Sequence, residues 1–275
     1  MTIQDDGCRL LARVREQGPL VHCITNFVAM DAAANAVLAI GASPAMVHAR
    51  EEVAEFAGIA SALTVNIGTL TPEWVESMKT AARAATAAGK PWVLDPVGVG
   101  ATSLRRKSAA QLLALKPTVV RGNASEIMVL AGLTDAGQKG VDSTQSSDAA
   151  EEPARRLART TGGSVVVTGA VDIATDGTRL FRIANGHPLM PRVTALGCSL
   201  TAITGAFLAV EKDALLAATV ATALFGLAGE IAARTAKGPG SLRVGLMDAL
   251  HTLDEPAIRA GLKVTELKVT GLKTP

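Results

Sequence analysis

Polar, charged or small side chains stand at the ends of four apolar, β-branched runs in this chain of 275 residues. Asp95, Arg121 and Thr168 each follow such a run directly, and Gly68 follows the fourth. The planar guanidinium of arginine matches phosphate oxygens, and carboxylates are ligands that Mg²⁺ accepts. If the runs are parallel strands, their carboxyl ends lie at one edge of a sheet, where such folds bind ligands. The four residues therefore indicate a site for a phosphorylated ligand.

Each of these residues also has an ordinary structural explanation. An aspartate followed by a proline, as at Asp95, is typical of a turn that caps its own backbone. Asn123 and Glu126 have the three-residue spacing of a capping box, although the same helix start would aim Glu126 at the ligand edge. Arg121 fits a surface ion pair equally well, and Thr168 fits a simple turn. On the functional interpretation, Asp95 and Glu126 together hold a hydrated Mg²⁺.

The segment Val193–Cys198 leads into the most apolar part of the chain. A turn followed by a helix start leaves backbone N–H groups unpaired at the positive end of the helix dipole, which favours an anion. We expect Gly197 and Cys198 at this terminus, and we expect the thiol there to be more acidic than a free one. Such a thiol accepts or orients a proton from a substrate hydroxyl. The alternative is a buried structural cysteine, which is the commoner fate of this residue type.

Alternating strands and helices must position these residues. The strand candidates are 62–67, 92–94, 118–120 and 164–167, and the helix candidates between them are 72–88, 104–115 and 147–160. Thr71 before Pro72 is a helix start signal. The alternation predicts an α/β fold with a mostly parallel central sheet covered by helices on both faces. A hairpin is predicted over 173–183, and two long alanine-rich helices from about 198 to 234.

The composition favours one globular domain over residues 1–275, with no nucleic-acid or membrane partner. Hydrophobic residues make up 48% of the chain, which is typical of a globular protein. The formal net charge of +2 lacks the excess of positive charge that is typical of proteins that bind nucleic acid. The apolar stretches 193–210 and 214–229 are interpreted as buried core helices rather than membrane spans. No secretory signal is visible and the three cysteines lack metal-type spacing, so we expect a soluble, cytoplasmic protein. We expect a helix over about 1–18, and a tail over about 260–275 that is either an extra strand or a disordered end.

Seven short segments, in order across most of the chain, are together similar to the hydroxyethylthiazole kinases, a family of the ribokinase-like superfamily. They are Pro19–Asn26, Ala39–Met46, Asn66–Leu70, Leu94–Gly98, Arg121–Glu126, Val167–Gly169 and Lys237–Ser241. Two common nucleotide fingerprints fail by contrast. Gly98–Ser103 lacks the third glycine of GxGxxG, and Gly132–Gly137 is followed by Gln138 rather than the lysine of a P-loop.

The resemblance implies a ribokinase-like three-layer sandwich that transfers the γ-phosphoryl group of MgATP to the hydroxyl of 4-methyl-5-(2-hydroxyethyl)thiazole, in thiamine salvage. Carried over residue by residue, it implies contacts with the thiazole for Met46, Asn26, Gly68 and Ala195, contacts with ATP for Arg121 and Thr168, and Mg²⁺ binding for Asp95 and Glu126. It implies a catalytic role for Cys198 with Gly197, at the place where most ribokinase-like enzymes have an aspartate. It also implies a homotrimer with the thiazole pocket at a subunit interface.

One departure from the family pattern falls in the turn before Cys198. The family turn reads Gly-Thr-Gly-Cys or Gly-Ala-Gly-Cys, whereas this chain has Ala195-Leu196-Gly197-Cys198. If the first position needs a positive φ, Ala195 is strained by roughly 1–2 kcal/mol relative to glycine, and its methyl group narrows the approach of the substrate. Two alternatives therefore stay open. One is a kinase for another small alcohol, such as a pyrimidine or a vitamin B6 precursor, and the other is a ligand-sensing module without turnover.

Overall fold

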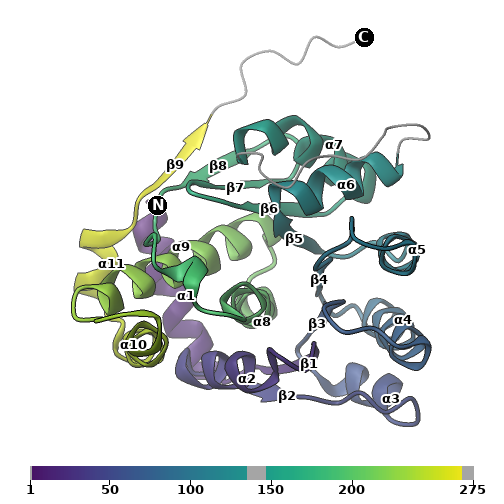
Figure 1. The fold of residues 1–275 in the computed structure, drawn as a ribbon. Helices are drawn as coiled ribbons and strands as arrows, with labels where there is room; N and C mark the ends of the chain where they lie inside the picture. The colour runs from purple at the N-terminus through teal and green to yellow at the C-terminus, as the bar shows by residue number, and fades with distance from the viewer. Residues whose placement is uncertain (1, 135–146, 268–275) are drawn as a thin grey trace.

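A nine-stranded sheet forms the centre of the computed structural model, which describes residues 2–134 and 147–267 (Figure 1). The strand order is β2-β1-β3-β4-β5-β6-β7-β8-β9, with parallel pairing from β2 to β6 and antiparallel pairing from β6 to β9. The strands are β1 Leu20–Ile24, β2 Ser43–Ala45, β3 Ala62–Asn66, β4 Trp92–Asp95, β5 Val119–Asn123, β6 Ser164–Thr168, β7 Asp172–Thr175, β8 Leu180–Ile183 and β9 Val264–Leu267. The parallel part brings the carboxyl ends of β1 to β6 to one edge, which is the ligand edge of the predicted fold.

Helices cover both faces of this sheet, as predicted (Figure 1). One face carries α3 Val53–Ile59, α4 Pro72–Ala87, α5 Ser103–Leu113, α6 Ala124–Thr134 and α7 Glu151–Thr161. The other carries α1 Ile3–Gln17, α2 Met30–Ala39, α8 Leu196–Val210, α9 Ala214–Ala233, α10 Pro239–Thr252 and α11 Glu255–Gly261. Because side chains alternate along a strand, neighbours on β4 enter different cores. Val93 packs into the core that includes α8 and α9, and Leu94 packs into the core under α4 and α5.

The two alanine-rich helices are the central helices of their layer. Twelve of the 15 residues of α8 and 15 of the 20 residues of α9 are buried. Among the described residues, α9 is the helix long and apolar enough to cross a membrane, and most of its length is buried inside the fold. This burial confirms the interpretation of both stretches as core helices.

The predicted elements agree with the structure to within a few residues, with two differences. Trp74 N donates to Thr71 Oγ1 at 3.2 Å, so the predicted helix start is confirmed. The strand expected at 118–120 is too short, because β5 continues to pair with β6 as far as Asn123 opposite Thr168. The segment expected as a helix from residue 147 instead opens with a 3₁₀ turn, Ser147–Ala150, and becomes α-helical at Glu151.

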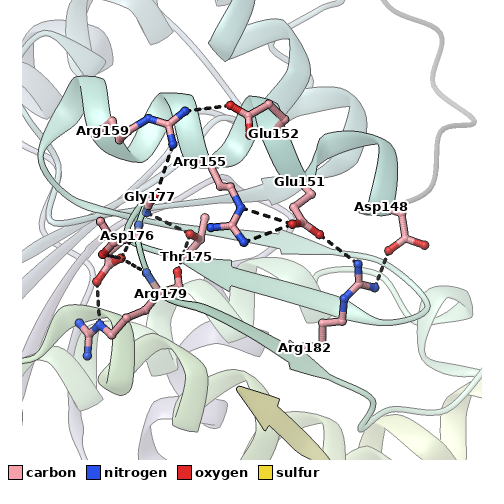
Figure 2. Close-up of polar contacts among 11 residues, drawn as sticks. Asp148, Glu151, Glu152, Arg155, Arg159, Thr175, Asp176, Gly177, Arg179 and Arg182 are labelled. Carbon is pink, nitrogen blue, oxygen red and sulfur yellow. Dashed lines mark hydrogen bonds and ion pairs between the residues drawn. The ribbon is translucent and has the colours of Figure 1, made fainter. Parts of the chain in front are cut away.

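The predicted hairpin is formed by β7 and β8, and a network of ion pairs ties it to α7 (Figure 2). Arg182 on β8 bridges two acids, with Asp148 Oδ1 at 2.6 Å and Glu151 Oε2 at 3.0 Å. Glu151 also accepts from the buried Arg155 within α7. At the hairpin turn, Asp176 Oδ1 accepts from the backbone of Arg179 at 2.7 Å. These contacts fix the hairpin that continues from the end of β6, and thereby the position of the β6–β7 turn.

The two ends of the chain add a helix and an edge strand. α1 begins with a capping box between Thr2 and Asp5, and β9 pairs with β8. The remainder of the predicted tail, 268–275, lies outside the described residues. The assignment of residues 1–275 to one domain stays a prediction.

Candidate active site

A buried chain of polar side chains runs along the ligand edge from β1 to β4. Asn26 Nδ2 donates to Asn66 Oδ1 at 2.8 Å, and Asn66 Nδ2 donates to Asp95 Oδ2 at 2.7 Å. Thr201 Oγ1 on α8 donates to the same carboxylate oxygen at 2.8 Å. All four side chains are buried. Asp95 thus links the strand ends to α8, and its bonds among the described residues are not those of an aspartate capping its own turn.

One oxygen of the Asp95 carboxylate has no hydrogen-bond partner in the part of the chain that the structure describes. Burial raises the pKa of Asp95 to about 6 against the lowering effect of Arg121, and the negative charge of Glu126 raises it further. The group is therefore mostly ionised at neutral pH. Its Oδ1 is buried and has no hydrogen-bond partner among the described residues. Since buried acceptors are normally paired, this oxygen fits a metal-bound water or a cation.

Arg121 lies where β4, β5, β6 and α8 meet. Its Nη1 is 3.7 Å from Asp95 Oδ2, and its Nη2 donates to Thr168 Oγ1 at 3.0 Å. The side chain is only 11% exposed, so the surface ion pair considered for it is wrong. A Cβ atom built on Gly197 would lie 2.8 Å from Nη1, so a side chain at this position would displace the guanidinium from the start of α8.

The N-terminus of α8 has the features predicted for an anion site. The helix follows Ala195, whose φ of 65° and ψ of 0° are left-handed, and no side chain of the described residues caps it. Ser199 N makes the first helical bond, to Ala195 O at 2.9 Å. The amides before Ser199, including that of Gly197, have no acceptor within the helix. Together with the guanidinium of Arg121 they bring several N–H donors to one position, which suits an anion.

Cys198 lies on the first turn of α8, where Asn26 Nδ2 donates to its Sγ at 3.3 Å. Burial raises the pKa of this thiol above its ordinary value, and the charge of Asp95 raises it further. The expectation of an acidic thiol is therefore wrong, because desolvation and a neighbouring carboxylate outweigh the helix terminus. The cysteine is partly buried and belongs to the polar network rather than to an apolar core. A neutral thiol in this position is suited to orienting a hydroxyl.

The capping box expected at Glu126 is present. Glu126 Oε2 accepts from Asn123 N, and Glu126 N donates to Asn123 Oδ1, both at 2.9 Å. The second oxygen, Oε1, accepts from Gly98 N at 2.9 Å. Glu126 thereby joins the loop after β4 to the start of α6, and its charge is close enough to raise the pKa of Asp95. Each of its oxygens retains a lone pair for a further donor.

A cavity of about 700 Å³ lies beside this network. Its polar lining comes from the strand ends and includes Arg121, Asn123, Thr168 and Asp172. Its apolar lining comes from α8, α9 and the segment before α8, and includes Val193, Leu200 and Phe225. Ala195 and Gly197 complete the lining at the helix terminus. Such a mixed lining suits a ligand that has an anionic part and an apolar ring.

The remaining predicted residues occupy the same edge near β1 to β3. Gly68 N donates to Asn66 Oδ1 at 2.9 Å, and a Cβ atom there would lie 2.6 Å from Asn26 Nδ2. Arg105 fixes the Gly68 carbonyl with a hydrogen bond of 2.8 Å. Met46 follows β2 and packs, half-buried, against the core on the α8 side. Among the described residues, Met46 makes no hydrogen bond to the polar network that contains Asn26 and Asp95.

Sequence reasoning missed three residues of the site. Asn66 is the last residue of β3 and connects Asn26 to Asp95. Thr201 is four residues after Gly197, a spacing that places both on one face of a helix and would have indicated its role. Asp172 opens β7 and lines the cavity, and the sequence offered only a strand boundary there.

The donors for a divalent metal are few. The described residues contain no group of three or more His, Cys, Asp and Glu side chains that would enclose a metal. Two carboxylates with waters and ligand phosphates are nevertheless a usual set for Mg²⁺. The unpartnered Asp95 Oδ1 and the spare lone pairs of Glu126 fit this kind of open site.

Comparisons with known proteins agree with one another. The hydroxyethylthiazole kinase family model matches residues 11–256. Hydroxyethylthiazole kinases of Cereibacter sphaeroides and Rhizobium etli are 61% and 59% identical over 260 and 257 residues, covering 94% and 93% of this chain and 98% and 99% of theirs. The solved structure of a hydroxyethylthiazole kinase protein from Pyrococcus horikoshii has a TM-score of 0.89 and 45% identity, covering 95% of this chain and 99% of its own.

More distant structures support the fold. A pyridoxal kinase from Staphylococcus aureus has a TM-score of 0.64 at 18% identity, covering 91% of this chain and 99% of its own. A ribokinase-like superfamily protein from Enterococcus faecalis has a TM-score of 0.63 at 14% identity, covering 90% of each chain. The architecture is thus ribokinase-like, as predicted.

Proposed function

This chain belongs to the hydroxyethylthiazole kinase family, and on that premise we propose how its residues divide the work of the reaction. The enzyme transfers the γ-phosphoryl group of ATP to the hydroxyl of 4-methyl-5-(2-hydroxyethyl)thiazole. The bond between the substrate oxygen and the γ-phosphorus forms while the bond to the bridging β–γ oxygen breaks and ADP leaves. Such a transfer has a loose transition state, so positioning and charge stabilisation provide most of the acceleration.

Arg121, Thr168 and the amide of Gly197 bind the phosphates of ATP. The observation that carries this assignment is the buried guanidinium of Arg121, held at 3.0 Å by Thr168 and directly beside the uncapped start of α8. Two sources of positive potential, a side chain and a helix terminus, meet at one point of the cavity wall. Negative charge that spreads onto the transferring group is stabilised there without rearrangement of the site.

Asn26 and Cys198 hold the reacting hydroxyl of the thiazole. Their contact of 3.3 Å and the raised pKa of the thiol support an orienting role for Cys198 rather than a strong base. A strong base is not required, because the attacking hydroxyl loses its proton late in a loose transfer, after the bond to phosphorus has largely formed, and the proton then passes to an oxygen of the transferred phosphoryl group or to water. Met46, Gly68 and Ala195 contact the thiazole ring and its substituents.

Asp95 and Glu126 are the residues that would hold Mg²⁺. The support is the Oδ1 atom of Asp95, which has no partner among the described residues, and the nearby charge of Glu126. When bound, the ion neutralises charge on the phosphates of the nucleotide. Among this chain's own residues, Asn66 and Thr201 keep the Asp95 carboxylate oriented by donating to Oδ2, which leaves Oδ1 for the ligand.

The working enzyme is a cytoplasmic homotrimer with the thiazole pocket at a subunit interface. Phe27 and Val28 directly follow Asn26 and are 63% and 66% exposed in the single chain. Large apolar side chains beside a ligand site are typical of a surface that another protein chain covers.

The test is ADP formation by the purified chain with MgATP and the thiazole alcohol, compared with a hydroxymethylpyrimidine and with pyridoxal as acceptors. We expect ADP formation that depends on the thiazole alcohol. A preference for the pyrimidine or pyridoxal would assign the enzyme to another small alcohol. Thiazole binding in calorimetry without ADP formation would favour the sensing module, for which the strained Ala195 is the specific argument.

A further inference from the structure

Asp172 is a fixed carboxylate on the cavity wall with no role in the scheme above. It opens β7, and the pairing of Val167 with Ile173 sets it across the hairpin from Thr168. Its Oδ1 accepts from Gly169 N at 2.8 Å, which closes the turn between β6 and β7. Ser147 Oγ holds the same turn by donating to Val171 O at 2.6 Å. The carboxylate is therefore held in place before any ligand arrives.

The other oxygen of Asp172 is free to bind a ligand. Oδ2 accepts no hydrogen bond from the described part of the chain, and the residue lines the cavity together with Arg121 and Thr168. Arg121 directs its nitrogens to Asp95 and Thr168 instead, so its charge reaches Asp172 only at longer range. Burial raises the pKa of Asp172 to about 6, which leaves the group mostly ionised at neutral pH.

An ionised carboxylate beside phosphate-binding residues needs a donor as its partner. Direct contact with phosphate oxygens is repulsive, and an ionised carboxylate only accepts hydrogen bonds. In a nucleoside triphosphate the donors nearest to the phosphates are the ribose hydroxyls. The cavity extends from the polar strand ends to the apolar residues Val193 and Phe225. If the phosphates bind at the polar end and the base at the apolar end, the sugar lies between them.

We propose that Asp172 accepts a hydrogen bond from a ribose hydroxyl of the bound nucleotide and thereby selects ribonucleotides over deoxyribonucleotides. This inference rests on the proposed function, in that Arg121 and Thr168 take the phosphates. A hydrogen bond to a charged partner is strong, and a site that holds such a partner rejects an analogue that lacks the hydroxyl. For a partly solvated carboxylate we expect roughly 10- to 100-fold discrimination against the deoxynucleotide.

The experiment measures nucleotide binding by calorimetry, without turnover, for ATP, 2′-deoxy-ATP and 3′-deoxy-ATP. Asp172→Asn keeps an oxygen for Gly169 N and replaces the free acceptor by an amide donor. Asp172→Ser, which keeps a turn-capping oxygen, is a second variant if the first folds poorly. The matched control is Asp148→Asn, an aspartate with a side chain that is 65% exposed and an ion pair with Arg182 outside the cavity lining.

We expect the wild-type chain and Asp148→Asn to bind ATP more tightly than one of the two deoxynucleotides. Asp172→Asn should discriminate less, because a neutral amide that donates to the hydroxyl oxygen replaces the charged acceptor, and Asp172→Ser, whose side chain is too short to reach the sugar, should bind all three alike. Absence of discrimination in the wild type would overturn the inference, and so would discrimination that persists in both Asp172 variants. Equal weakening of all three nucleotides, or a change in metal requirement alone, would likewise reject the sugar contact. ADP formation with the thiazole is measured in parallel, so that a failure of the proposed function is distinguished from a failure of this inference.

Discussion

Ala195 precedes α8 in a left-handed backbone conformation, and its replacement by glycine makes a sharp prediction. Its backbone has φ of 65° at the N-cap of α8, and its side chain lines the cavity. The left-handed conformation brings the Cβ of an L-residue too close to the following carbonyl oxygen, a clash that glycine does not have. The substitution Ala195→Gly therefore relieves strain at the helix terminus that we assign to phosphate binding.

The expected gain in stability is small because two effects oppose each other. Relief of the left-handed conformation is worth about 1–2 kcal/mol. The greater freedom of glycine in the unfolded chain offsets about 0.4–1 kcal/mol of this. The midpoints of the two ranges leave a net gain of about 0.8 kcal/mol, which corresponds to a rise of about 2–3 °C in Tm for a chain of this size.

Lys116→Gly is the matched control for the backbone effect. Apart from glycines, Lys116 and Ala195 are the described residues with a positive φ, and φ of Lys116 is 58°. Lys116 is exposed shortly after the end of α5 and does not line the cavity. Strain that is equal in the free enzyme and in the transition state changes stability but not rate. We therefore expect both variants to gain stability in urea unfolding, and only Ala195→Gly to lower the KM for the thiazole, by roughly two- to five-fold, because its methyl group leaves the pocket.

Two results would contradict this reasoning. If Ala195→Gly lowers stability while Lys116→Gly raises it, the methyl group of Ala195 stabilises the fold by more than its strain costs. If the two variants change KM equally, or if Ala195→Gly leaves it unchanged, the methyl group does not border the thiazole.

Three further substitutions probe the network around Asp95. Cys198→Ala should lower kcat by about ten-fold, which is less than the 10²–10⁴-fold loss expected for a general base, and should change the thiazole affinity less. Cys198→Asp should keep or improve turnover. Full activity of the alanine variant would show that the cysteine only packs against its neighbours. Asp95→Asn should abolish activity and raise the free energy of unfolding at pH 8 by about 2–3 kcal/mol. The reason is that burial raises the pKa of Asp95 from 3.8 to about 6, so the ionised carboxylate destabilises the fold increasingly above pH 4 and fully above about pH 6. This gain should fade as the pH falls from 6 to 4, and a gain that is independent of pH in urea unfolding would refute the cause. Glu126→Gln should raise the Mg²⁺ concentration needed for half-maximal ADP formation, and an unchanged metal titration would leave Glu126 with its bonds to Asn123 and Gly98 alone.

The sequence located the edge of the sheet at which the site lies, and the reason is topological. Parallel strands that alternate with helices bring their carboxyl ends together, so polar residues after each run must meet. Asn26 and Cys198 are 172 positions apart and yet in contact. The limits of the strands and helices that were predicted followed from turn residues, with two exceptions: β5 continues through Arg121 because β6 offers it a partner as far as Asn123, and the helix expected from residue 147 becomes α-helical only at Glu151.

The sequence did not predict properties that depend on distance and burial. The acidity expected of Cys198 follows from its place at a helix start, but the structure adds desolvation and the charge of Asp95, which act in the opposite direction. Asn66 resembles an ordinary residue at a strand end, and only the fold turns it into the link between Asn26 and Asp95. Roles that arise from two neighbours on other elements have no signature in the local sequence.

The buried charges of Asp95 and Arg121 at the ligand edge are explained by the binding of a charged ligand. Asp95 and Arg121 are 3.7 Å apart, and each keeps a polar atom without a partner among the described residues, namely Oδ1 and Nε. A pair retained for stability alone would satisfy those atoms, because an unpaired buried polar group costs about 1–3 kcal/mol. A site that binds a metal-bound water and a phosphate instead leaves one acceptor and one donor atom unpaired until the ligand is bound. The energy lost in the empty enzyme is then recovered when the charged group of the substrate arrives, which is the moment at which stabilisation contributes to catalysis.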